Sequence, residues 1–186
     1  MARNIITALD VGTSTIQTVV AERKKGEEGL RILGIGSVPS AGVRRGMVVD
    51  LEEATPAVRR SVYEAQKSAG VPVRSVWLAV GGAYVAVSSS RGVVAVSRAD
   101  QEISQEDIKR VIAAAGTFVA KSPNREVLHM IPRDFKVDNE AGIKDPIGMR
   151  GVRLEVDTLI IECASSFLKN LFKCVEGAGL KVEDYV

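Results

Sequence analysis

Three short apolar segments open the chain, and polar residues separate them. The first runs from Ile5 to Leu9 and ends at Asp10, after which residues 11–14 have the composition of a turn. Further strand-like segments follow at residues 15–21 and 30–37. Because antiparallel strands can be joined by short connections, we expect these three strands to form an antiparallel meander.

A helical pattern follows the three strands. Asp50 stands where an N-cap residue is expected, apolar residues recur at helical spacing as far as Ala69, and Gly70 is placed to end the helix. Residues 76–80 then form a short apolar run, which is typical of a buried strand. This order predicts an α/β unit in which the helix covers one face of the sheet.

The pattern changes at Gly81-Gly82. Valines on either side of residues 88–92 predict a β-hairpin, and Ser104 begins a second helix with a capping-box-like start. The elements expected after this helix are a polar connection (120–125), a long strand (126–137), a loop (138–149) and another strand (152–161).

The last part of the chain predicts a strongly amphipathic helix. It covers residues 164–178, Gly179 is placed to end it, and residues 180–182 begin another strand. Since a helix that leads into a strand is an unusual place for a domain to end, we expect Val186 to be a boundary within a longer protein.

Composition places the chain among soluble globular proteins. Apolar residues make up 46% of the 186 positions but aromatic residues only 4%, so we expect an aliphatic core. The 25 basic and 23 acidic residues give a net charge of +2, which is too balanced to indicate a nucleic-acid-binding surface. We interpret the short basic clusters, Arg23-Lys24-Lys25 and Arg44-Arg45, as solvated turns.

The apolar runs and the cysteines indicate the cellular compartment of the protein. No apolar run approaches the roughly 18 residues that cross a bilayer, and the first residues do not resemble a signal peptide. If Cys163 and Cys174 lie on one helix, about 16 Å separates them along its axis, which is too far for a disulfide. Two unpaired thiols favour a reducing compartment, and we expect the cytoplasm.

The segment Asp10-Val11-Gly12-Thr13-Ser14 is the first candidate for chemistry. Gly12 lets the backbone approach a ligand, and backbone N–H groups with the hydroxyls of Thr13 and Ser14 can hold phosphate oxygens. The carboxylate of Asp10 can hold a hydrated magnesium ion that neutralises the phosphates. The same residues also fit an ordinary hairpin turn, so the motif alone leaves both interpretations open.

Other chemistries find little support in the sequence. Gly34-Ile35-Gly36 is not a dinucleotide-binding fingerprint, because Pro39 stands where its third glycine belongs. His129 is the only histidine and the two cysteines are far apart, so a protein-bound metal site is not expected. We interpret His129 as a structural or partner-contact residue.

Taken together, several segments resemble the FtsA family of actin-like bacterial cell-division proteins. LDVGTSTIQTVV (9–20) is similar to the phosphate-binding hairpin of the actin and sugar-kinase superfamily, and residues 32–54 resemble the stretch that follows it in FtsA proteins. VWLAVGGAYV (76–85) resembles the entry into the insert that is special to FtsA. The most specific likeness lies in the insert and the residues after it, at residues 101–112, 127–161 and 167–186.

The resemblance implies a fold and a division into domains. The expected fold class is α/β (α+β), with an actin- or ribonuclease-H-like first subdomain and an inserted SHS2-type strand-helix-strand-strand subdomain. Residues 1–81 and 163–186 would form part of subdomain 1A, and residues 82–162 would form subdomain 1C.

The resemblance also implies a function. The family binds ATP with Mg²⁺, polymerises at the inner face of the cytoplasmic membrane at midcell, and tethers the FtsZ ring there. Asp10, Gly12, Thr13 and Ser14 would form the first phosphate-binding segment, with Asp10 holding Mg²⁺ through water. Thr15 stands where many relatives have a lysine, which removes one possible cation. The insert would contact other FtsA protomers and other division proteins.

The remaining parts of such a protein would lie after Val186. They include the rest of the nucleotide site, the FtsZ-binding subdomain and a C-terminal membrane-binding helix. We therefore expect at most a weak ATPase in the full-length protein, and neither tight ATP binding nor hydrolysis by this chain alone.

Three alternatives remain at this point. A PilM-type pilus-assembly ATPase is also actin-like and has a similar insert, and a sugar kinase shares the first hairpin. A stand-alone peptide-binding module is the third possibility.

Overall fold

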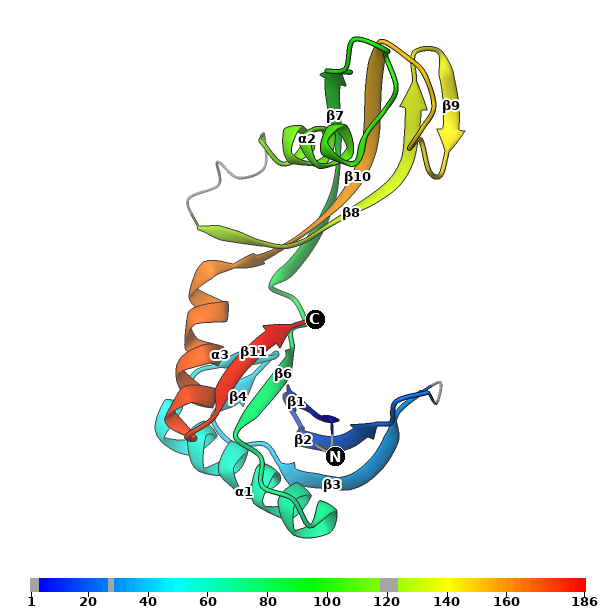
Figure 1. Cartoon of the computed structure of the whole chain (residues 1–186). Coiled ribbons are helices and arrows are strands. Elements are labelled where there is room, and N and C mark those ends of the chain that lie inside the picture. Colours follow the sequence, from blue (N-terminus) through cyan, green and yellow to red (C-terminus); the bar gives the residue numbers. More distant parts are fainter. Residues whose placement is uncertain (1–3, 27–28, 118–123) are drawn as a thin grey trace. The chain divides into compact units, whose positions relative to one another are not determined.

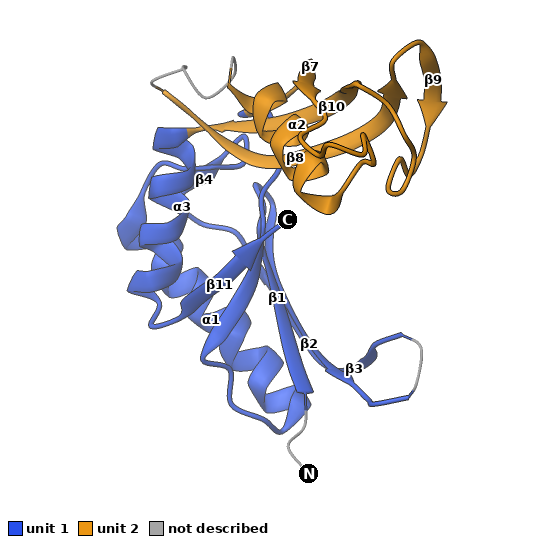
Figure 2. Cartoon of the chain, turned by 45° about the horizontal axis from the view of Figure 1, so that its top comes forward, with its two compact units in different colours: residues 1–84, 165–186 blue, residues 85–164 orange. Residues whose placement is uncertain are grey.

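The structure, a computed structural model, describes residues 4–26, 29–117 and 124–186. The chain forms two compact units, of which unit 1 comprises residues 1–84 and 165–186 and unit 2 comprises residues 85–164 (Figures 1 and 2). Most of the polar connection expected at residues 120–125 falls outside the described residues.

Unit 1 is built on a five-stranded sheet with the order β11-β6-β1-β2-β3 (Figure 1). β1 (Asn4–Val11) pairs antiparallel with β2 (Thr15–Arg23), which pairs antiparallel with β3 (Arg31–Pro39), so the predicted meander is confirmed. β6 (Ser75–Ala79) runs parallel to β1, and β11 (Lys181–Tyr185) runs parallel to β6. The carboxyl ends of β1, β6 and β11 therefore lie at the same end of the sheet.

Two helices, α1 (Leu51–Ala69) and α3 (Ser165–Gly177), pack against each other and cover one face of this sheet (Figure 2). The side chain of Asp50 accepts two backbone N–H bonds from the first turn of α1, at 2.9 and 3.1 Å. Gly70 ends α1 with a φ of 69°, so both predicted ends of this helix are confirmed. The buried side of α3 carries apolar residues that the pattern predicted, namely Phe167, Leu168, Leu171 and Val175.

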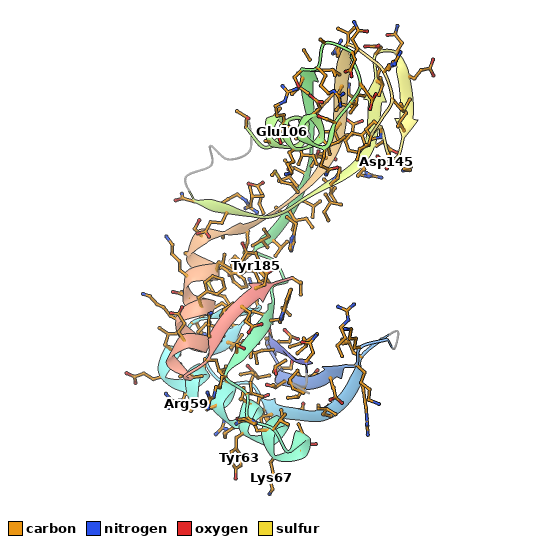
Figure 3. All side chains as sticks on the ribbon, in the orientation of Figure 1. Arg59, Tyr63, Lys67, Glu106, Asp145 and Tyr185 are labelled. Carbon is orange, nitrogen blue, oxygen red and sulfur yellow. The ribbon has the colours of Figure 1, made fainter. Side chains whose placement is uncertain are left out.

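The outer side of α1 faces solvent. Tyr63 and Lys67 project from α1 away from the sheet (Figure 3), and Tyr63 is 65% exposed. Arg59 precedes Tyr63 by one turn and donates a hydrogen bond to the carbonyl oxygen of Gly177. A guanidinium at this place complements the negative end of the α3 dipole.

The glycines of the Gly34-Ile35-Gly36 segment serve packing. A Cβ atom at Gly36 would lie 1.9 Å from the carbonyl oxygen of Ser61, and one at Gly34 would lie 2.4 Å from the backbone nitrogen of Ala69. α1 therefore approaches β3 more closely than any side chain on these residues would permit.

A small hairpin lies between β3 and α1. Its strands are β4 (Val43–Arg44) and β5 (Met47–Val48), and they pair antiparallel. Arg45 and Gly46 form the turn with φ values of 51° and 81°. Positive φ at both central residues defines a type I′ turn, a conformation that costs an L-residue such as Arg45 roughly 1 kcal/mol.

Unit 2 is a four-stranded antiparallel sheet in which the strands follow the order β7 (Val85–Ala95), β10 (Arg153–Ala164), β8 (Arg125–Val137) and β9 (Glu140–Ile143). One helix, α2 (Gln105–Gly116), packs on one face of this sheet and closes an apolar core. The predicted capping box is confirmed, since the side chain of Ser104 accepts from the backbone of Asp107 and the side chain of Asp107 accepts from that of Ser104. The core contains Ile103, Ile108, Val111, Ala115, Phe135, Val137, Leu154 and Val156.

The hairpin predicted around residues 88–92 is wrong. β7 (Val85–Ala95) is one continuous strand, and it pairs with β10 (Arg153–Ala164) without interruption. Its small central residues lie under α2 instead of forming a turn. A Cβ atom at Gly92 would lie 2.0 Å from the carbonyl oxygen of Val111, and the hydroxyl of Ser90 donates to the carbonyl oxygen of Ala115 at 2.7 Å.

Two further expectations need correction. The stretch at 138–149, predicted as a loop, contains β9 (Glu140–Ile143), because Asp138 takes a φ of 50° and turns the chain back after β8 (Arg125–Val137). Cys163 lies in β10 and not on a helix with Cys174, although both cysteines are free as expected, and both are buried. No helix in the described ranges is long and apolar enough to span a membrane.

Candidate functional site

The bend between β1 and β2 lies at the carboxyl end of the sheet in unit 1. Asp10 is exposed, and its backbone is in parallel register with Ala79 at the end of β6. In sheets with parallel strands, ligands bind in crevices at the carboxyl ends of the strands. The sequence-predicted segment therefore stands at the part of the sheet where a ligand site is expected.

The bend is tight and depends on Gly12. Its N–H donates to the carbonyl oxygen of Thr15 at 3.1 Å, and a Cβ atom at Gly12 would lie 2.8 Å from that same oxygen. Val11 is buried and anchors the bend in the core, whereas Thr13 and Ser14 are exposed. Any residue larger than glycine at position 12 would force the bend open.

The turn of the β4–β5 hairpin is joined to this bend. The N–H of Gly46 donates to the hydroxyl oxygen of Thr13 at 2.7 Å. Because the hydroxyl acts as an acceptor in this bond, its hydrogen can point toward a ligand. The N–H of Ser40 donates to the carbonyl oxygen of Ser14 at 3.0 Å and holds the other side of the bend.

A cavity of about 290 Å³ opens beside the bend. Three of the four sequence-predicted site residues line it, namely Asp10, Gly12 and Thr13, whereas Ser14 is not among its lining residues. Drug-sized ligands occupy pockets of roughly 300–1,000 Å³. The cavity is therefore close in size to pockets that hold a small ligand or one end of a larger ligand.

Sequence reasoning missed the residues on the other sides of the cavity. Arg45 and Gly46 contribute from the hairpin turn, Gly81 and Gly82 follow β6, and α3 contributes Phe167 and Leu171. The basic pair Arg44-Arg45 followed by a glycine is the available signal, but from the sequence alone it predicts only a solvated turn. Arg45 is therefore a positively charged residue among those that line the cavity.

Aromatic stacking stiffens the α3 side of the cavity. The ring of Phe167 stacks on that of Tyr84, with 5.3 Å between the centroids and an interplanar angle of 19°. Such an offset pair is worth about 1 kcal/mol beyond its buried area. Phe167 is 2% exposed, so this wall is part of the packed core.

The described residues include no group of three or more His, Cys, Asp or Glu side chains that could hold a metal ion. A divalent cation at this cavity would have one protein carboxylate, that of Asp10, with the remaining ligands from water and from a bound anion. This is the coordination that Mg²⁺ prefers, since it keeps several of its waters and binds one or two carboxylates together with phosphate oxygens.

The most strongly perturbed carboxylate lies elsewhere, in unit 2. Asp107 is buried and accepts hydrogen bonds from Ser97, from Ser104 and from the guanidinium of Arg110. Burial by itself would raise the pKa of Asp107, but these hydrogen bonds outweigh it and hold the pKa well below its usual range. The bonds from Ser97 and Ser104 tie the start of α2 to the loop before it, and Arg110 lies one turn further along the same helix, so we assign this carboxylate a structural role.

Comparisons with known proteins point to one group of relatives. Residues 82–162 match the family model of the SHS2 domain inserted in FTSA. The chain is 43% identical over 186 residues to cell division protein FtsA of Borreliella burgdorferi, which covers all of this chain and 45% of that protein. It is 38% identical to FtsA of Bacillus subtilis (95% of this chain, 40% of that one) and 34% identical to FtsA of Escherichia coli (99% and 43%).

Among solved structures, the chain is similar to one from a PilM–PilN type IV pilus biogenesis complex. The TM-score is 0.65 at 13% identity, over 97% of this chain and 46% of that one, so this likeness concerns the fold alone. The chain spans less than half of the length of the curated relatives given above.

Proposed function

This chain belongs to the FtsA family over its whole length, and from that premise we propose that unit 1 forms one wall of an ATP site while unit 2 makes protein contacts. The resemblance read from the sequence is confirmed, and so is the fold class, an α/β protein of actin-like type with an SHS2 insert. We assign residues 1–81 and 163–186 to subdomain 1A and residues 82–162 to subdomain 1C.

One observation carries the nucleotide proposal. Asp10, Gly12 and Thr13 border an open cavity at the carboxyl ends of β1 and β6, and the bend that contains them is not packed into the interior. The hydroxyl of Thr13 would donate to a phosphate oxygen while its own oxygen is held by Gly46. A bound Mg²⁺ would neutralise the phosphates, and Asp10 would hold one of its waters.

Arg45 supports the same proposal. Its guanidinium is a permanent positive charge that can bind a phosphate through two parallel hydrogen bonds. The type I′ turn holds Arg45 in a backbone conformation that few non-glycine residues adopt. We infer that Arg45 supplies the cation that the lysine after the bend supplies in many relatives.

The cavity is one side of a site, which agrees with the length of the relatives. The three FtsA proteins compared above are more than twice as long as the matched segment, and we propose that their additional residues complete the nucleotide pocket. Nucleotide would then act as a clamp between two lobes and favour the conformation that polymerises. This chain alone would bind Mg-ATP weakly and would not hydrolyse it.

The test uses a full-length FtsA protein whose first 186 residues are those of this chain. Isothermal titration with Mg-ATP should show binding. Asp10→Ala should raise the Kd at least tenfold, which corresponds to about 1.4 kcal/mol of binding free energy. Glu52→Ala is the matched control, because Glu52 is an exposed acid of unit 1 that does not line the cavity. Lack of Mg-ATP binding by the wild type would refute the ATP site, and unchanged affinity in Asp10→Ala would refute the role of Asp10.

We further propose that the whole protein works at the inner face of the cytoplasmic membrane at midcell and links FtsZ filaments to that membrane. The sequence relationship to FtsA proteins, at 34–43% identity, supports this role over that of a pilus-assembly ATPase, since the PilM–PilN likeness is at 13% identity. Co-sedimentation of the full-length protein with FtsZ filaments tests the proposal. Absence of FtsZ from the pellet fraction that contains the protein would count against it.

A further inference from the structure

One edge of β7 is available for pairing with a further strand. β7 is the terminal strand of its sheet, and its eleven residues pair only with β10 among the described residues. We propose that this edge pairs antiparallel with β7 of a second copy of the chain, about a two-fold axis at Ser90, so that two four-stranded sheets become one. This inference deepens the proposed role of unit 2 in contacts between protomers and rests on it.

β7 lacks the devices that usually protect an edge strand. Proteins block such edges with proline, with bulges, with very short strands or with several charges. β7 contains no proline, its register with β10 runs without a shift from Val85 to Ala95, and Arg91 is its only charged residue. That charge is already engaged, since the guanidinium of Arg91 lies 2.9 Å from the carboxylate of Asp157 on the neighbouring strand.

The order of residues in β7 is nearly symmetric. Apolar residues occupy positions 85–87 and 93–95, and mainly small polar residues occupy the five positions between them. Antiparallel pairing about Ser90 therefore sets apolar residues opposite apolar residues and small residues opposite small ones. A self-complementary sequence of this kind fits a second copy of the same strand, because a two-fold interface requires one patch to match itself.

Two exposed valines determine the register. Val87 is 58% exposed and Val93 is 42% exposed, and they stand three residues on either side of Ser90. Side chains alternate along a strand, so both valines point to the face of the sheet opposite α2, and each would lie directly across from the other in the second copy. Pairs of β-branched residues in direct cross-strand contact stabilise a sheet.

The same register keeps like charges apart. Arg91 would stand opposite Ser89 of the second copy and not opposite its own counterpart, and its ion pair with Asp157 would remain in place. A register shifted by two residues, with Arg91 opposite Arg91, would set two guanidiniums face to face, which destabilises a strand pair.

Cysteine cross-linking tests the register in the chain as it stands. In the proposed dimer, Cα atoms of directly opposite residues lie about 4.5–5.5 Å apart, within the range that a disulfide spans. Val87→Cys and Val93→Cys chains, mixed and mildly oxidised, should form a covalent dimer on a non-reducing gel. Each variant alone should not, because residue 87 would be six positions from its own counterpart. The native thiols of Cys163 and Cys174 are buried and should not interfere.

A matched control and a second measurement complete the design. Val152→Cys is the control, because Val152 is 57% exposed and belongs to the same unit but lies outside β7. This variant should not cross-link with either of the other two. Sedimentation velocity over a concentration series should show a dimer that the Val87→Lys/Val93→Lys double variant loses and that Val152→Lys keeps. Dimers in either single-cysteine variant, or no dimer in the mixture, would overturn the β7 pairing. A dimer that survives the double lysine substitution would do so too, while the wider contact role of unit 2 would stand.

Discussion

The N–H of Gly46 donates a 2.7 Å hydrogen bond to the hydroxyl of Thr13, and this bond joins two turns that are 33 residues apart in the sequence. It fixes the orientation of the Thr13 hydroxyl at the edge of the cavity. The bond therefore links the local shape of the β4–β5 hairpin to the proposed phosphate site.

Thr13→Val should separate ligand binding from folding. Valine has nearly the same shape but no hydroxyl, so we expect weaker binding of Mg-ATP in the full-length protein. The free energy of unfolding should fall by about 1 kcal/mol or less, because the lost bond is exposed to solvent. Thr13→Ser keeps the hydroxyl and should keep the affinity, and titration calorimetry with urea unfolding measures both effects. Equal affinity in the valine and serine variants would contradict the role of the hydroxyl.

Arg45→Asn should change affinity and stability in opposite directions. Asn-Gly is the preferred pair of a type I′ turn, so replacing Arg45 should raise the free energy of unfolding by roughly 0.5–1 kcal/mol. Loss of the positive charge should weaken Mg-ATP binding, and the salt dependence of binding should become shallower.

Arg44→Ala is the control for this pair of measurements. Arg44 is the neighbouring exposed arginine but does not line the cavity beside Asp10. Both variants remove one positive charge from the same hairpin, so a general effect of net charge would lower their affinities equally. Only a specific role of Arg45 predicts a difference between them.

Asp107→Asn should destabilise unit 2 in a pH-dependent way. The pKa of Asp107 is lower in the folded protein than in the unfolded chain, so its ionised form stabilises the fold. This contribution is complete above the ordinary aspartate pKa of about 3.9 and is lost as the pH falls below that value toward the lower folded pKa. At pH 7 we expect a cost of about 2 kcal/mol.

Hydrogen exchange of the α2 amides, compared at pH 7 and in acid, measures this effect locally. The difference between wild type and Asp107→Asn should shrink as the solution is acidified, because protonation of Asp107 in the unfolded chain removes the advantage of its ionised form in the fold. A difference that stays constant with pH would show that the substitution acts through shape and not through charge.

Gly36→Ala should strongly destabilise unit 1. The added methyl group would meet the carbonyl oxygen of Ser61 at 1.9 Å, and α1 would have to move away from β3. Overpacking of this kind typically costs about 1–3 kcal/mol, and here it acts against backbone atoms. Gly81→Ala is the control, since a Cβ atom there meets nothing within 4 Å. The two midpoints of urea unfolding, followed through Trp77, should differ clearly.

Local signals in the sequence located the helices of this fold well. Asp50 and Gly70 marked the two ends of α1, and Ser104 with Asp107 marked the start of α2. These residues act on backbone groups only a few positions away, so their effect is visible in a short window of sequence. The apolar alternation of the first strands worked for the same reason.

The errors arose where long-range packing decides the structure. Ser88 to Gly92 have the composition of a turn, but the pairing with β10 and the closeness of α2 make them the middle of a strand. The hydrogen bond between the β4–β5 hairpin and Thr13 brings Arg45 to the cavity, and the parallel pairing of β6 with β1 brings Gly81 there. Neither contact produces a periodic pattern in the sequence. Of the residues around the cavity, only the bend at Asp10 was therefore predictable.

The strand order of unit 1 also bears on how the chain is made on the ribosome. Strands β1 to β3 and helix α1 contact one another and are complete by residue 69, before any residue of unit 2 emerges. β11 pairs with β6 although 101 residues lie between Ala79 and Lys181, so this edge of the sheet is the last to close. In the nascent chain, we thus expect the meander and α1 to assemble first. The edge of β6 that pairs with β11 should stay unpaired until the carboxyl-terminal strand has been synthesised.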